Sequence, residues 1–189
     1  LFKPVVQHPE TFTYSPPEET FYELMSEFIL AGKAYATSLS RTEGGQVMLV
    51  LIALQKLASS SIAAVVAALQ TRIKRLGAEA AKSKSELAAI DEGEGDEAQQ
   101  ALQRWLRDEK QARLRLMEDE GRYLSDLIAA ADQVTSETRI VRIIEVIKQR
   151  FGNEPVLLFT EYKRTQALVI SALMAEFGQG AVGFMNGDD

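Results

Sequence analysis

The amino-acid sequence predicts a mainly α-helical protein with a partial α/β end. Apolar residues recur at helical spacing through most of the first 135 residues, and capping residues mark where several of these stretches begin. From residue 136 onward, helical stretches alternate with short apolar runs that are typical of buried parallel strands. Because 46% of the 189 residues are hydrophobic, the chain has enough apolar side chains to bury a sizeable core.

The first predicted elements are a short β-prone segment and a helix. Residues 11–14 alternate in polarity, as the residues of a half-buried strand do. Ser15, Pro16 and Glu18 then combine a capping side chain, a proline for the first turn and an acid near the positive helix end. These signals predict a helix from about residue 17 to residue 35. Its apolar face carries Phe21, Leu24, Met25, Phe28 and Ile29.

Two further helices are predicted in the apolar stretch that follows. Gly44 and Gly45 predict a break before a helix at 46–58, and the serines at 59–61 predict the N-cap of a third helix. The stretch 47–69 has the length of a membrane span, but the central Lys56 would make insertion costly by about 2.5–3.5 kcal/mol. We therefore expect two helices in the core of a soluble, cytoplasmic protein, with no membrane partner.

The middle of the chain predicts a loop and one long helix. Residues 91–97 hold five acids and two glycines, a composition that opposes regular structure and predicts a flexible surface loop. An amphipathic helix is predicted at about 97–131. Its apolar positions are Leu102, Trp105, Leu106, Leu114, Met117, Leu124, Leu127 and Ile128.

The last third of the chain predicts helix, strand, helix and strand. The first helix opens at 136–138 and ends at 150–153, and a buried-type strand follows at 155–160. A helix at 161–177 and a second strand at 181–185 complete the pattern. Two parallel strands do not form a stable sheet alone, so they need either further strands or another part of this chain. Since the sequence begins with Leu1 and stops just after the second strand, we expect an excerpt from a longer protein.

Composition excludes several kinds of chemistry. The absence of cysteine excludes disulfides, cysteine–zinc sites and thiol catalysis, and the single histidine, His8, excludes a multi-histidine metal site. The net charge of −6 is uneven: residues 1–90 carry +1 and residues 91–189 carry −7. Within the first half, residues 71–84 hold five bases and one acid, which is either a basic patch or, more commonly, a solvated helix face.

The candidate site is the block at 154–165. A predicted strand ends there in Thr160, Tyr162, Lys163, Arg164 and Thr165, which would surround the N-terminus of the next helix. Backbone N–H groups, hydroxyls and two cations together suit a phosphate oxygen, although a capped helix start with solvated cations gives the same pattern. The predicted second strand ends at the same edge in Asn186 and Gly187.

This block resembles motif IV of superfamily-two helicases. Residues 155–165, followed by Gly187, are most similar to Swi/Snf-type DNA translocases, which include the bacterial RapA-like proteins. Residues 12–22 resemble the strand and helix that leave the first RecA-like lobe of that family. Residues 54–61 resemble the helical block that precedes the second lobe. The resemblance extends in order over nearly the whole chain.

The resemblance implies three regions and a motor function. Residues 1–35 would leave the first lobe, residues 36–135 would be an inserted helical subdomain, and residues 136–189 would begin a second RecA-like lobe with its first β-α-β unit. DNA-backbone contacts are then implied for Thr160, Tyr162, Arg164, Thr165, Asn186 and Gly187, and Lys56 with the serines at 59–61 would either support that groove or cap helices.

The parts of such a motor that act on ATP have no counterpart in this sequence. The family's phosphate-loop lysine, its acidic box and its arginine-bearing motif are absent, so no catalytic or cofactor-binding residue is expected. ATP and Mg²⁺ would belong to the whole motor, whose other parts and DNA would be the partners. The alternative is a non-enzymatic helical adaptor that binds a partner helix through residues 97–131.

Overall fold

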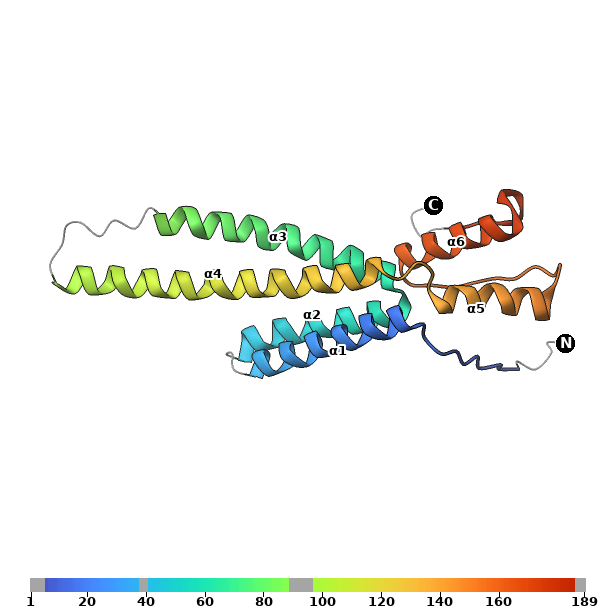
Figure 1. Ribbon diagram of the computed structural model, residues 1–189, viewed down its shortest axis with the longest axis horizontal. Helices are drawn as coiled ribbons and strands as arrows, with labels where there is room; N and C mark the ends of the chain where they lie inside the picture. Colours follow the sequence, from blue (N-terminus) through green and yellow to red (C-terminus); the bar gives the residue numbers. More distant parts are fainter. Residues whose placement is uncertain (1–5, 38–40, 89–96, 186–189) are drawn as a thin grey trace.

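The computed structural model describes residues 6–37, 41–88 and 97–185, and these residues form six α-helices with no β-strand (Figure 1). The first four helices make two hairpins, and the last two lie at one end of them. The helices are α1 (Pro16–Thr37), α2 (Arg41–Ser60), α3 (Ile62–Ala88), α4 (Glu97–Asp132), α5 (Thr138–Val146) and α6 (Lys163–Phe177).

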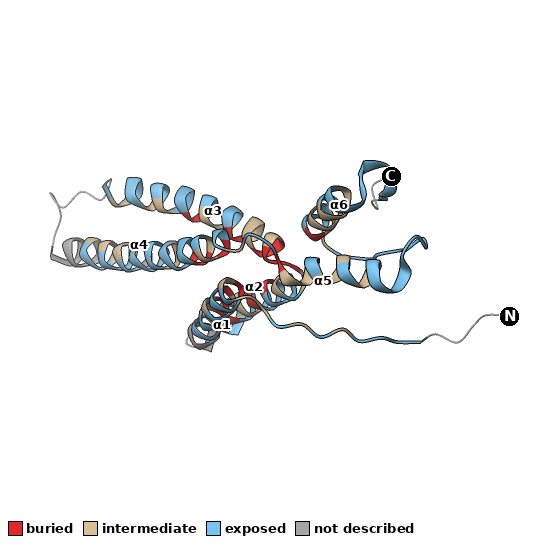
Figure 2. Ribbon diagram, turned by 45° about the vertical axis from the view of Figure 1, so that its right-hand side comes forward, coloured by how far each residue is buried: buried red, intermediate tan, exposed pale blue. Residues whose placement is uncertain are grey.

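The hydrophobic core lies where the two hairpins meet. Buried apolar residues gather there from all four helices, whereas the distal part of the α3–α4 hairpin extends past the α1–α2 hairpin with mostly exposed residues (Figures 1 and 2). This arrangement confirms the apolar face predicted for α1. The core residues are Phe21, Met25, Ile29, Leu51, Leu54, Ile62, Val65, Leu69, Leu76, Leu124, Leu127 and Ala131.

Two predictions about loops have different outcomes. The break predicted at Gly44 and Gly45 is wrong, because both glycines lie inside α2. Glycine inside a helix costs about 1 kcal/mol relative to alanine, which the packing of the apolar α2 face against α1 readily exceeds. The acidic loop predicted at 91–97 lies outside the described residues up to Asp96, and Glu97 begins α4.

The partial α/β end is wrong for the described part of the chain. Residues 155–160 are extended, but no backbone hydrogen bond joins residues 155–159 to another described residue. Their apolar side chains face solvent, with Leu157 76% exposed and Phe159 87% exposed. A strand exists only when a neighbouring strand accepts its backbone hydrogen bonds, and the described residues supply none.

The second predicted strand and the β-prone N-terminal segment are also not strands. Gln179–Ala181 form a 3₁₀ turn, and residues 182–185 and 11–14 are irregular. The first β-α-β unit of a RecA-like lobe is therefore not formed, although its predicted helices are. The helix predicted from 136 begins at Thr138 and ends in a π-helical turn, Ile147–Phe151, closed by Gly152 with φ of +56°.

No helix in the described ranges is both long enough and apolar enough to cross a membrane. The apolar stretch 47–69 is divided at Ser61, where α2 has ended and α3 has not begun. Nor do the described residues bring together three acidic or histidine side chains that could hold a metal ion.

Candidate nucleic-acid interface

The chain turns sharply at Ser59, Ser60 and Ser61, which we call the helix corner. The Oγ atom of Ser61 accepts a hydrogen bond from the backbone N–H of Ala64 at 3.1 Å, so Ser61 is the N-cap of α3. The Ser59 hydroxyl donates to the carbonyl oxygen of Lys56 at 2.7 Å, within the last turns of α2. The predicted N-cap of the third helix is thus confirmed at Ser61.

Two side chains next to the start of α5 complete the caps of the helix corner. The Arg139 guanidinium donates hydrogen bonds to the backbone carbonyl oxygens of Ser59 and Ser60, where a cation complements the negative C-terminal end of α2. The Glu137 carboxylate accepts a hydrogen bond from the N–H of Ala63 at 3.2 Å, at the positive N-terminal end of α3. Residues more than seventy positions away therefore hold both helix ends.

Helix α6 is joined to the helix corner by a hydroxyl cluster. The Oγ1 atom of Thr165 lies 2.8 Å from the Oγ atom of Ser60 and 2.8 Å from that of Ser61. Thr165 is 6% exposed and Ser61 is fully buried, so water does not compete for these hydrogen bonds. The contact fixes the first turn of α6 against the helix corner.

Glu18 joins the N-termini of α1 and α5 beside the helix corner. Its carboxylate accepts hydrogen bonds from Ser15 N at 2.8 Å and Ser15 Oγ at 2.7 Å, from Thr138 N at 2.8 Å, and from the Thr138 hydroxyl. Burial disfavours the charged carboxylate, but the hydrogen bonds from Thr138 and Ser15 outweigh it and hold the pKa of Glu18 below its ordinary 4.5. One side chain therefore caps two helices that are 120 residues apart.

The second buried carboxyl group, Glu137, has the opposite perturbation. Burial raises the pKa of Glu137 above its ordinary 4.5, and Glu18 raises it further; the hydrogen bond from Ala63 and the charge of Arg139 offset only part of this. A carboxyl group with a raised pKa in the folded state stabilises the fold below its unfolded pKa. This contribution is lost as the pH rises through the folded-state pKa.

We expect Glu137→Gln to remove this pH-dependent loss of stability. The free energy of unfolding of the variant, relative to the original chain, should rise as the pH increases from 4.5 through the folded-state pKa and be constant above it. Urea unfolding followed by circular dichroism at a series of pH values measures the difference. A difference that does not change with pH would show that Glu137 titrates normally.

An open pocket of about 480 Å³ lies beside the helix corner. Its floor is apolar, and Gln70 of α3 and Arg164 of α6 both line it. Asp132 and Glu137 also line it, so the pocket is mixed in charge. This shared lining places the first turn of α6 and the N-terminal turns of α3 on one surface.

The structure gathers most of the predicted site around the start of α6. Tyr162 precedes the helix, and its side chain makes no capping hydrogen bond to α6. The backbone N–H of Tyr162 instead donates to the hydroxyl of Thr160 at 3.4 Å. Lys163 and Arg164 are exposed in the first helical turn, where the positive helix end adds to their charge.

One other predicted residue lies elsewhere. Lys56 is exposed on α2, one turn before the helix corner. Asn186 and Gly187 lie outside the described residues. Thr165 belongs to the gathered set, but its hydroxyl is engaged with Ser60 and Ser61 rather than directed to solvent. The DNA contacts predicted for all these residues stay predictions.

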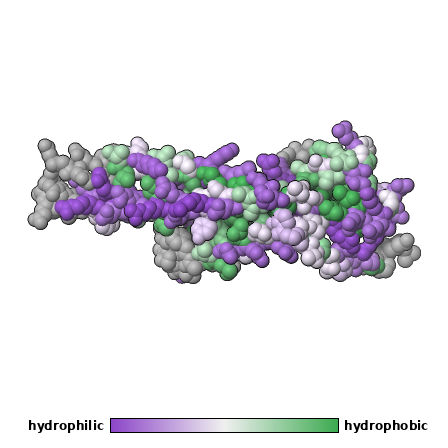
Figure 3. Space-filling view, viewed as in Figure 1, coloured by the Kyte–Doolittle hydropathy of each residue, from purple (hydrophilic) through white to green (hydrophobic). Residues whose placement is uncertain are grey.

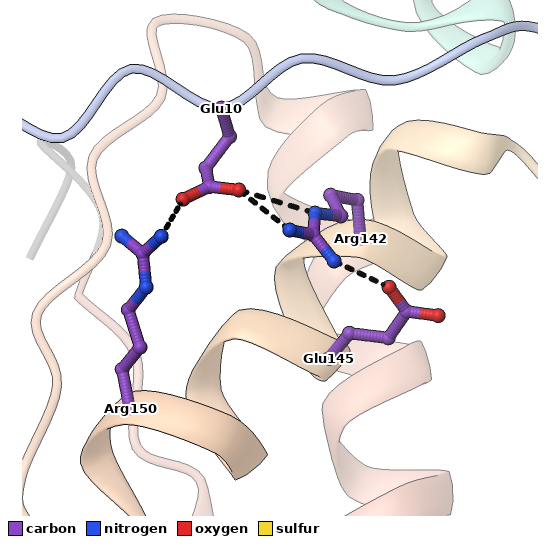
Figure 4. Close-up of polar contacts among 4 residues, drawn as sticks. All are labelled: Glu10, Arg142, Glu145 and Arg150. Atoms are coloured by element: carbon purple, nitrogen blue, oxygen red, sulfur yellow. Dashed lines mark hydrogen bonds and ion pairs between the residues drawn. The ribbon is translucent and has the colours of Figure 1, made fainter.

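Sequence reasoning missed a cluster of charges that holds the N-terminal segment beside α5 (Figure 4). The Oε2 atom of Glu10 accepts hydrogen bonds from Arg142 Nη2 at 2.7 Å and Nε at 3.2 Å, and Arg150 contacts the other carboxylate oxygen. Arg142 also pairs with Glu145 at 2.8 Å. The hydrogen bonds from Arg142 lower the pKa of Glu10 below its ordinary 4.5. No local signal announces this cluster, because its members are up to 140 residues apart.

Comparison of the chain with protein-family models, with curated proteins and with solved structures finds no match. The described residues define a helical protein with a cationic helix start fixed to a buried hydroxyl corner.

Proposed function

We propose that this chain is a DNA-contacting part of an ATP-dependent motor of the Swi/Snf type that tracks along duplex DNA. In this proposal the chain contacts the DNA backbone and supplies the helices that hold those contacts. It does not hydrolyse ATP alone, and ATP with Mg²⁺ binds to other parts of the motor. The sequence blocks that resemble this family, at 12–22, 54–61 and 155–165, support the proposal by their order.

One structural observation carries the proposal: the hydroxyl of Thr165 meets those of Ser60 and Ser61 at 2.8 Å. The two blocks that contain these residues are 104 and 105 positions apart, yet they pack as one unit. A shared site requires such a meeting, and nothing in the local sequence imposes it.

The electrostatics at this place suit a phosphate group. The N-terminus of α6 carries the positive end of the helix dipole, and Lys163 and Arg164 add two cations there. Such groups contact the sugar-phosphate backbone without reading base sequence. Asp132, which lines the same pocket as Arg164, opposes the binding of an anion, so we expect weak affinity for the chain alone.

The experiment that tests the proposal is a salt titration of DNA binding. We expect the purified chain to bind duplex DNA weakly, with an affinity that falls as salt rises because bound phosphates release counterions. Arg164→Gln should reduce the slope of log K against log salt by about one, irrespective of base sequence. Fluorescence anisotropy with a labelled duplex gives both quantities.

Arg115→Gln is the matched control. Arg115 is exposed on α4 and lies about 25 Å along that helix from its corner end, so the variant loses the same charge at a distant place. Its slope should equal that of the original chain. Equal slopes for the Arg164 and Arg115 variants would remove the site assignment, and no salt-dependent binding at all would contradict the function.

A second candidate, a helical adaptor, is favoured by the exposed apolar residues of α4. Trp105, Leu116 and Tyr123 are all more than half exposed, and their spacing of 11 and 7 residues places them on one side of the helix. Figure 3 also shows apolar surface gathered over α6 and the segment that precedes it. This candidate would be favoured if Arg164→Gln left DNA binding unchanged and the side of α4 that carries Trp105, Leu116 and Tyr123 bound a helical peptide.

A further inference from the structure

The outward side of α3 is basic, and only part of its charge is neutralised. Among the five bases at 71–84, Arg72 and Lys84 reach across the hairpin to Glu120 at 2.7 Å and Glu118 at 3.0 Å. Lys74 and Arg75 are exposed, and no ion pair joins either to an acidic residue of the described segments. The hairpin thus uses some of its cations for folding and leaves two pointing to solvent.

Lys74 continues the surface at the start of α6, and Arg75 is its neighbour on the exposed side of α3. Gln70 lines the same pocket as Arg164, and Lys74 is one helical turn beyond Gln70, about 6 Å along α3. Thr71 and Arg75 are related by the same four-residue step. Because Leu69 and Leu76 of α3 are buried in the core, the intervening exposed residues lie on the opposite side.

We propose that the surface formed by Gln70, Thr71, Lys74 and Arg75, the α3 basic face, binds the phosphate backbone of duplex DNA beside the contact made by Arg164. This inference rests on the proposed function and extends its site from α6 onto α3. The four side chains combine two cations with an amide and a hydroxyl, which are the groups that position proteins on DNA phosphates. Asp132 bounds the face at the pocket and Glu79 bounds it one turn beyond Arg75.

The test compares two double variants that lose the same charge from the same helix. Lys74→Gln with Arg75→Gln removes both cations of the face, whereas Lys82→Gln with Lys84→Gln removes cations that pair with Glu86 and Glu118. We expect the first pair to reduce the slope of log K against log salt for a labelled duplex by roughly 1.8, which corresponds to two phosphates. The second pair should change this slope by less than about 0.5.

Each outcome has a defined meaning. Equal loss for both double variants would overturn the inference, because net charge rather than the α3 basic face would then govern binding. A loss with Arg164→Gln but none with the Lys74 and Arg75 variant would overturn the inference and leave the proposed function standing. If the Lys74 and Arg75 double variant lost binding to a polyglutamate peptide but bound DNA as the original chain does, the face would be assigned to an acidic protein instead. Absence of DNA binding by the original chain would contradict both proposals.

Discussion

Replacing Glu18 with alanine is expected to lower the free energy of unfolding by about 2–4 kcal/mol. The side chain is 1% exposed and caps α1 through Ser15 and α5 through Thr138. Its removal deprives two helix starts of an acceptor and leaves the Thr138 N–H group without a protein partner in a half-buried place. Unfolding in urea, followed by circular dichroism, measures this loss.

Acid should reduce the difference between this variant and the original chain. Since the pKa of Glu18 is lowered in the folded state, its carboxylate stabilises the fold above pH 4.5, and this contribution is lost as the pH falls through the folded-state pKa. Glu19→Ala is the control, because Glu19 is the exposed neighbour in the same helical turn and should cost less than about 1 kcal/mol. Similar losses for both variants would refute the double cap.

Replacing Phe21 with alanine is expected to cost about 3–5 kcal/mol. Phe21 is fully buried in the core between the hairpins. The centroid of its ring lies 5.4 Å from the ring centroid of Tyr22, in an edge-to-face arrangement. The variant loses the buried surface of the ring and leaves a cavity that the surrounding helices fill only partly. The same urea experiment measures the change.

Leu30→Ala provides the comparison for Phe21→Ala. Leu30 lies on the same helix but is 64% exposed, so its truncation should cost less than about 1 kcal/mol. If the two variants were destabilised equally, the side of α1 that faces the other hairpin would be assigned wrongly. The ranking of the two variants, rather than either value alone, decides this point.

Helices were predictable because their signals are local. The apolar spacing of α1 and α4 and the capping serines lie within a few residues of the elements that they specify. The break predicted at Gly44 and Gly45 failed because the tertiary packing of α2 outweighs the low helix propensity of glycine. Local rules thus predicted that these helices form. They failed where contacts between helices determine the structure.

The predicted strands show the opposite situation. An apolar run such as Val156–Phe159 indicates which side chains would be buried in a sheet, but it does not supply the neighbouring strand. In the described part of the chain nothing pairs with it, and Phe159 faces solvent. A strand is a property of two segments, so the sequence of one segment could not decide it.

The candidate site was predictable in composition but not in geometry. The polar block at 160–165 was visible as a helix start rich in hydroxyls and cations. That Thr165 uses its hydroxyl to hold the helix corner, and that Arg139 and Glu137 cap the two helices there, depends on contacts 74 to 105 residues apart. Of the predicted residues, Arg164 combines an exposed cation with a place on the shared pocket.

The central claim is that the start of α6, fixed to the helix corner, contacts DNA phosphates. Titration of the isotope-labelled chain with a short duplex, followed by backbone amide chemical shifts in NMR, tests it most directly. We predict the largest shifts at the amides of residues 160–166, with smaller shifts at residues 70–75 of α3. Shifts confined to the exposed stripe of α4 around Trp105 and Leu116, or no shifts at all, would contradict the claim.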